Sequence, residues 1–101
     1  MSVSSSFQAF AQEAPAQQAA WMTMVRGLAE ASALDPRTEE LAYLAVLAAT
    51  GMESGLPFHV AQAKALGVTR DELVSALLVG LPAVGHRAVA ALPAALAAYD
   101  A

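Results

Sequence analysis

The fold is decided by residues 35–72, which read DPRTEELAYLAVLAATGMESGLPFHVAQAKALGVTRDE. The stretch opens with Asp35 and Pro36, a pair typical of a helix start, because aspartate caps the first turn and proline fits its first position. Gly51 predicts the end of that helix, since glycine tolerates the left-handed backbone that often follows a helix. Between these signals Leu41–Ala49 is apolar on every face, which indicates a helix buried on all sides.

The same kinds of signal predict helices on both sides of this one. Thr69 begins a TRDE sequence, a capping box that opens a later helix. Alanine is the commonest residue, isoleucine is absent, and no stretch alternates convincingly between apolar and polar residues, so we expect no strands. The result is an all-α protein of about six helices in one domain over residues 1–101. The further helices are predicted over residues 5–12, 15–32, 55–67, 69–79 and from 82 onward, where Pro93 should kink or split the last one.

The composition indicates a subunit that assembles with copies of itself. Of the 101 residues, 57% are hydrophobic, against roughly 45–50% in ordinary soluble proteins. A small domain has much surface for its volume and cannot bury such a surplus alone, so we expect a homo-oligomer. The net charge is −4, and the five basic residues are scattered along the chain. No basic face for nucleic acid is therefore expected.

No segment is typical of a targeting sequence or a membrane anchor. The N-terminus, MSVSSSF, lacks the basic and apolar regions of a signal peptide. The apolar stretch 41–51 is shorter than the roughly 20 residues that a membrane span needs. The longer stretch 73–99 is interrupted by two prolines and by a histidine–arginine pair. We therefore expect a cytoplasmic protein whose apolar helices are buried or lie at interfaces.

Two residues suited to proton transfer lie on neighbouring predicted helices, Glu40 on the first and His59 on the second. A tight turn near Gly51–Gly55 makes these helices antiparallel, and the two residues lie roughly 16 Å and 6 Å from it. Direct contact therefore requires an extended connection or a bridging water. Histidine titrates near neutral pH, so such a pair could relay protons. The alternative is a solvated acidic helix start and a structural histidine.

The order Glu40, Met52, Gly55, His59 resembles the core motif of the carboxymuconolactone decarboxylase/AhpD-like family. In the thiol-dependent branch of that family, two cysteines occupy the positions of Met52 and Gly55, and the glutamate and histidine relay a proton to activate a thiol. The resemblance implies a six-helix AhpD-like orthogonal bundle that assembles into trimers or hexamers through apolar helices. This chain has no cysteine, so it cannot run a dithiol peroxidase cycle.

Charge weighs against the substrate of the family's decarboxylase branch. That substrate is a carboxylated lactone and carries two negative charges. The cationic candidates near the motif are His59, His86 and Arg87, whereas Glu40 and Glu53 would repel a dianion.

Two functions stay open at this point. The first is a small-molecule enzyme in which Glu40 and His59 are catalytic and transfer protons without thiols, as a lactone decarboxylase-type reaction would require. The second is a non-catalytic helical oligomer that binds a small apolar ligand or a partner protein. No cofactor is implied, and two histidines 27 residues apart predict no metal site. Residues expected to line a pocket are Met52, Glu53, Ser54 and Gly55, with Tyr43, His86 and Arg87 as further candidates.

Overall fold

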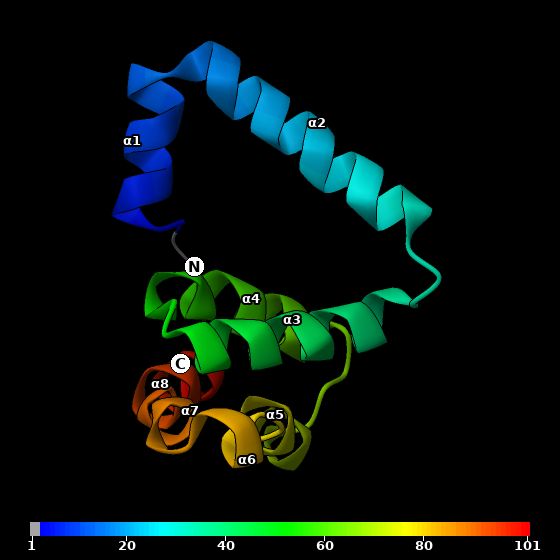
Figure 1. Ribbon diagram of the computed structural model, residues 1–101, viewed down its shortest axis with the longest axis vertical. Helices are drawn as coiled ribbons and strands as arrows, with labels where there is room; N and C mark the ends of the chain where they lie inside the picture. The colour runs from blue at the N-terminus through cyan, green and yellow to red at the C-terminus, as the bar shows by residue number, and fades with distance from the viewer. Residues whose placement is uncertain (1–2) are drawn as a thin grey trace.

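The computed structural model describes residues 3–101 and is built from helices (Figure 1). No strand occurs in this range, which confirms the predicted all-α class. Six of the helices have eight or more residues, as the sequence predicts, and two shorter ones, α6 and α7, divide the C-terminal region. The elements are α1 (Ser5–Glu13), α2 (Pro15–Ala31), α3 (Pro36–Thr50), the 3-10 turn η1 (Glu53–Gly55), α4 (Leu56–Ala65), α5 (Arg70–Leu77), α6 (Leu81–Val84), α7 (His86–Ala90) and α8 (Leu92–Asp100).

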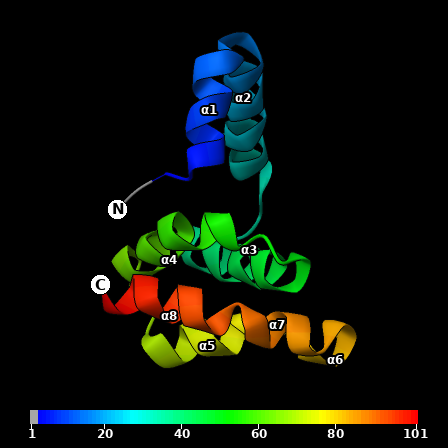
Figure 2. The same cartoon turned by 90° about the vertical axis from the view of Figure 1, so that its left-hand side faces the viewer.

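The chain separates into an N-terminal arm and a helical body. The arm is the hairpin of α1 and α2, and it stands clear of α3–α8 in both views (Figures 1 and 2). No residue of α1 or α2 is buried. The body, α3–α8, gathers around one apolar core. The short segment 32–35 joins the arm to the body at the start of α3.

The core of the body is built from leucines, valines and alanines on α3, α4, α5 and α8 and the turns between them. Fully burying one leucine side chain stabilises the fold by about 1.5–3 kcal/mol. Several alanines are also buried, and their small side chains allow the helices to approach one another closely. The largest fully buried side chains are Leu44, Leu56, Leu73, Leu77, Val60 and Val68.

Helix α3 begins and ends as its sequence predicts, but it is buried on one side only. The Asp35 side chain accepts a hydrogen bond from the backbone N–H of Thr38 at 2.9 Å, and Gly51 adopts the left-handed conformation with φ 73°. The prediction of burial on every face is wrong for the single chain, because Tyr43 is 45% exposed and Val46 is 55% exposed. The neighbouring helices α4, α5 and α7 pack against the other side of α3.

The C-terminal region is broken into three helices. Pro93 lies in the first turn of α8, where its missing N–H costs nothing, so the predicted split occurs there. A second break, which the sequence did not predict, lies at Gly85 between α6 and α7. The backbone of Gly85 has φ 65° and ψ −139°, a conformation that favours glycine.

Polar contacts tie α8 to the α4–α5 connection. The Arg70 guanidinium donates two hydrogen bonds to the carboxylate of Asp100, each of 3.0 Å, and it lowers the pKa of that carboxyl. The Tyr99 hydroxyl donates to the carbonyl of Val68 at 2.9 Å, and the Lys64 ammonium donates to the Tyr99 carbonyl at 2.7 Å. These contacts hold the C-terminal helix against α4, against α5 and against the segment that joins them.

Glu72 joins the start of α5 to the start of α3. One of its carboxylate oxygens accepts hydrogen bonds from the Arg37 guanidinium and from the backbone N–H of Thr69. The second bond completes the capping box that the sequence predicts, since the Thr69 hydroxyl in turn accepts from the N–H of Glu72. The bond from Arg37, followed by that from Thr69, lowers the pKa of Glu72 from 4.5 to about 2.

Replacing Glu72 with glutamine should make folding less sensitive to acid. In the unfolded chain this carboxyl gains a proton near its ordinary pKa of 4.5, whereas the folded chain keeps it charged to a pH of about 2. Its contribution to stability is therefore complete above about pH 4.5 and is lost as the pH falls toward about 2. Urea unfolding at several pH values across this window should show a smaller acid loss for Glu72→Gln than for the wild type. Glu39→Gln, in the first turn of α3, is the control and should retain the wild-type decline.

Candidate functional site

Glu40 on α3 and His59 on α4 are in direct contact. His59 Nδ1 lies 2.6 Å from Glu40 Oε1. The register follows from the connection, because Gly55 packs beside Leu47, a full turn back from the end of α3. One turn further along α4, His59 is then level with Tyr43 and Glu40. The contact is direct, but the connection that allows it is compact rather than extended, because the left-handed Gly51 and the 3-10 turn η1 bring the chain back beside Leu47.

Gly55 allows α3 and α4 to lie this close. A Cβ atom built on Gly55 would lie 3.3 Å from Leu47 Cδ1 and 3.9 Å from His59 Cδ2. The first distance is tighter than ordinary van der Waals contact, so a side chain at this position would have to push Leu47 aside. Gly55 is therefore explained here by helix packing beside the Glu40–His59 pair.

Aromatic side chains flank the histidine. The Tyr43 ring lies 4.5 Å from the His59 ring, centroid to centroid, at an interplanar angle of 51°. The Phe58 ring meets the His59 ring edge-on at 5.2 Å. The side chains of His59 and Glu40 are 27% and 17% exposed, so the pair is largely covered and partly accessible to solvent. Tyr43, predicted as a pocket residue, does lie at this site.

The contact determines which imidazole nitrogen is available for chemistry. An ionised carboxylate can only accept hydrogen bonds, so His59 Nδ1 donates its hydrogen to Glu40. The neutral ring then carries its lone pair on Nε2, which makes no hydrogen bond to any residue between Val3 and Ala101. A histidine whose first nitrogen is oriented by a carboxylate has the arrangement of a general base.

The other predicted pocket residues on the α3–α4 connection lie at the surface. Met52 is 56% exposed, and Glu53 and Ser54 are exposed in η1. Within the described residues, the side chains of Glu53 and Ser54 make no hydrogen bond. Gly55 alone of this group is placed against His59.

His86 and Arg87 are not brought to the pair. Arg87 Nη1 donates to the carbonyl of Thr50 at 3.3 Å, at the C-terminal end of α3. Thr50 lies ten residues after Glu40, which is about 15 Å along a helix. Arg87 thus caps the end of α3, where the helix dipole also stabilises a positive charge. His86, the neighbour of Arg87, is exposed.

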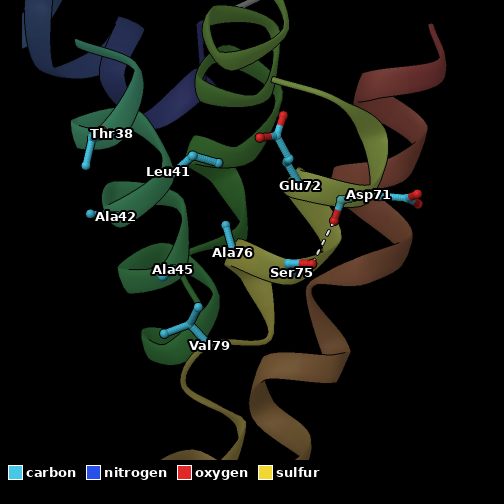
Figure 3. Close-up of a pocket in the computed structure, with 9 residues that line it drawn as sticks. All are labelled: Thr38, Leu41, Ala42, Ala45, Asp71, Glu72, Ser75, Ala76 and Val79. Atoms are coloured by element: carbon cyan, nitrogen blue, oxygen red, sulfur yellow. Dashed lines mark hydrogen bonds between the residues drawn. The ribbon is translucent and has the colours of Figure 1, made fainter. Parts of the chain in front are cut away.

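A groove on the opposite flank of α3 was not predicted from the sequence. It lies between α3 and α5, has a volume of about 580 Å³ and is almost wholly apolar (Figure 3). The signal that could have revealed it is the recurrence of small residues every three or four positions on two helices that pack together. The residues lining it are Thr38, Leu41, Ala42, Ala45, Asp71, Glu72, Ser75, Ala76 and Val79.

Neither a metal centre nor a membrane segment emerges from the structure. Across residues 3–101, no three histidine, aspartate or glutamate side chains come together in a way that could hold a metal ion. The helices in the same range are too short or too polar to cross a membrane.

The helical body places a glutamate–histidine contact on two antiparallel helices, and the chain has no cysteine, so it defines a small all-α protein that carries this contact and no thiol. The chain belongs to the carboxymuconolactone decarboxylase family, whose model matches residues 15–97. The match extends the resemblance found in the sequence to α2 and to most of α8. No curated protein and no solved structure matched the chain.

Replacing Glu40 with glutamine should remove the preference of His59 for one tautomer. The amide of glutamine can donate or accept, so it no longer requires a hydrogen on Nδ1. Long-range proton–nitrogen correlation spectra of labelled protein, recorded where histidine is neutral, report the tautomer directly. The chain has two histidines, so exposed His86 is an internal reference that should not change. A His59 tautomer unaffected by the substitution would contradict the assigned contact.

Proposed function

We propose that the protein is a small-molecule enzyme in which His59 and Glu40 move a proton to or from a carbon atom of the substrate. His59 Nε2 is the atom that exchanges the proton, and Glu40 holds the ring in the tautomer that leaves Nε2 free. The 2.6 Å contact between Nδ1 and Glu40 Oε1 carries this proposal. The partial exposure of the pair supports it, because a buried structural histidine would be closed to substrates.

The charges around the pair favour a neutral or singly charged substrate. Glu40 contributes a negative charge at the site, and Arg87 is engaged at the far end of α3. Within residues 3–101 no lysine or arginine forms an ion pair with Glu40. A dianion such as carboxymuconolactone would therefore lack a cationic partner here. The substrate class that fits is a lactone or ketone whose carbon acid lies next to the carbonyl group.

The flanking rings support the same class of substrate. The Tyr43 and Phe58 rings both contact the His59 ring and give the site apolar walls. A flat, weakly polar ring would contact these walls while its acidic carbon faces Nε2. Tyr43, which is 45% exposed, also carries a hydroxyl that can donate a hydrogen bond, and it lies on the same helix as Glu40, one turn further along.

Hydrogen–deuterium exchange tests the proposal without knowledge of the net reaction. The protein is incubated in deuterium oxide with a panel of neutral lactones, cyclic ketones, a monocarboxylated lactone and carboxymuconolactone. Proton spectra then report the loss of the signal next to the carbonyl group. We expect exchange above the buffer rate for neutral or monoanionic compounds and none for the dianion.

Two outcomes would contradict the proposed reaction or its substrate class. Exchange and decarboxylation of the dianion at the highest rate would restore the decarboxylase substrate and contradict the charge argument. Exchange at the buffer rate across the panel, together with saturable binding of an apolar compound, would support the non-catalytic alternative, in which the helical protein binds a ligand without converting it.

A further inference from the structure

The arm carries an apolar face that its own subunit leaves open. Met24, Val25 and Leu28 share one side of α2 at helical spacing, and they are 45%, 38% and 63% exposed. Helix α1 covers the beginning of this face, where Phe10 packs edge-on against Trp21 at 6.3 Å. The free residues lie beyond that contact, toward the end of α2 that joins the body.

The surface area indicates how much of the subunit needs covering. A compact protein of 10.3 kDa has an accessible surface of about 5,400 Å², whereas this chain exposes 6245 Å². The excess of roughly 850 Å² is close to the ~800 Å² that each partner buries in a standard protein–protein interface. The radius of gyration, 14.0 Å, also exceeds the ~13 Å expected for a compact domain of this length.

The groove between α3 and α5 has the size and chemistry of a helix-binding site. From Thr38 to Ala45 it extends about 10 Å along α3, the same distance that separates Trp21 from Leu28 on α2. Its walls carry alanines and a serine, which allow another helix to approach closely, and Val79 at its lower end is 70% exposed (Figure 3).

Charge is compatible with this fit. At the acidic end of the groove, Glu72 is already paired with Arg37, and the Asp71 carboxylate points away from the groove (Figure 3). On α2, the charged residues Arg26 and Glu30 lie opposite the apolar face, because each residue turns a helix by about 100°. Apolar surface therefore meets apolar surface, and no charge would be buried without a partner.

We propose that the apolar face of α2 in one subunit docks into the α3–α5 groove of a second copy of this chain. Every copy carries both halves of the contact, the arm and the groove. A subunit whose arm docks on a second copy still has its own groove free. The contact can therefore repeat from subunit to subunit and close into a ring. This proposal is independent of the chemistry at His59, because the groove lies between α3 and α5 and the Glu40–His59 pair lies between α3 and α4.

Cross-linking between engineered cysteines tests the contact, and the absence of natural cysteines makes the background clean. A tagged chain with Met24→Cys is mixed with an untagged chain carrying Ala45→Cys and treated with a short bismaleimide. We expect a heterodimeric product on a denaturing gel. Glu30→Cys, on the opposite face of α2, is the matched control and should give at least tenfold less product.

A chain that carries both Met24→Cys and Ala45→Cys distinguishes an arm that docks on another copy from an arm that docks on its own subunit. Products of doubled and higher mass support docking between copies, whereas cross-linking within single chains would overturn it in favour of an arm that covers its own groove. Light scattering at micromolar concentration supplies a second measurement. The Leu28→Asp variant should have a lower mass in solution than the wild-type oligomer, whereas the Arg26→Asp variant should have the wild-type mass. A monomeric wild type, or equal cross-linking from Cys at positions 24 and 30, would also overturn the proposal.

Discussion

Replacing His59 with alanine should slow hydrogen exchange at the substrate carbon by at least about 100-fold, the ordinary contribution of a positioned general base. The variant loses the nitrogen that takes the proton and keeps the fold, because His59 lies at the edge of the core and is not among the fully buried side chains. The loss should appear in kcat more than in KM, since Tyr43 and Phe58 still line the site.

The control for this result is His86→Ala. His86 is the second histidine of the chain and is exposed at the start of α7, away from the pair. It should retain wild-type exchange rates, and both variants should have the wild-type helical circular dichroism. Full activity in folded His59→Ala would remove His59 from the mechanism and leave its contact with Glu40 a structural one.

The ends of the central helices were predictable because their signals are local. Asp35, Gly51 and Thr69 act on backbone groups within three or four residues of themselves, and the structure shows each in the expected conformation. The split at Pro93 is local in the same sense, since it follows from the missing N–H of one residue.

The arrangement of the site depended on contacts that no local signal reveals. The Glu40–His59 contact needed the connection to return to the level of Leu47 before α4 begins, and this follows from how Gly55 packs. The exposure of Tyr43 and Val46 depends on which side of α3 the other helices pack against. Arg87 reached the end of α3 through the break at Gly85, whose backbone angles are not encoded in any short pattern.

Helix α3 also provides the sharpest test of what stabilises the body. Replacing Leu44 with alanine should lower the free energy of unfolding by about 3 kcal/mol, since it combines lost burial with a cavity that the surroundings fill only in part. Leu44 is 0% exposed and belongs to the central apolar cluster, one turn along α3 from Glu40. Because a protein of this size has a total stability of only ~5–15 kcal/mol, the loss should be plain in urea unfolding.

Val46→Ala is the matched control on the same helix. Val46 is 55% exposed, and alanine favours helices slightly more than valine, so the change should stay within about 0.5 kcal/mol of the wild type. A similar loss in both variants would mean that the outer side of α3 is covered in solution as fully as the inner side. A negligible loss of unfolding free energy in Leu44→Ala would contradict the packing of α3 against the core. It would also contradict the helix register that brings Glu40 into contact with His59.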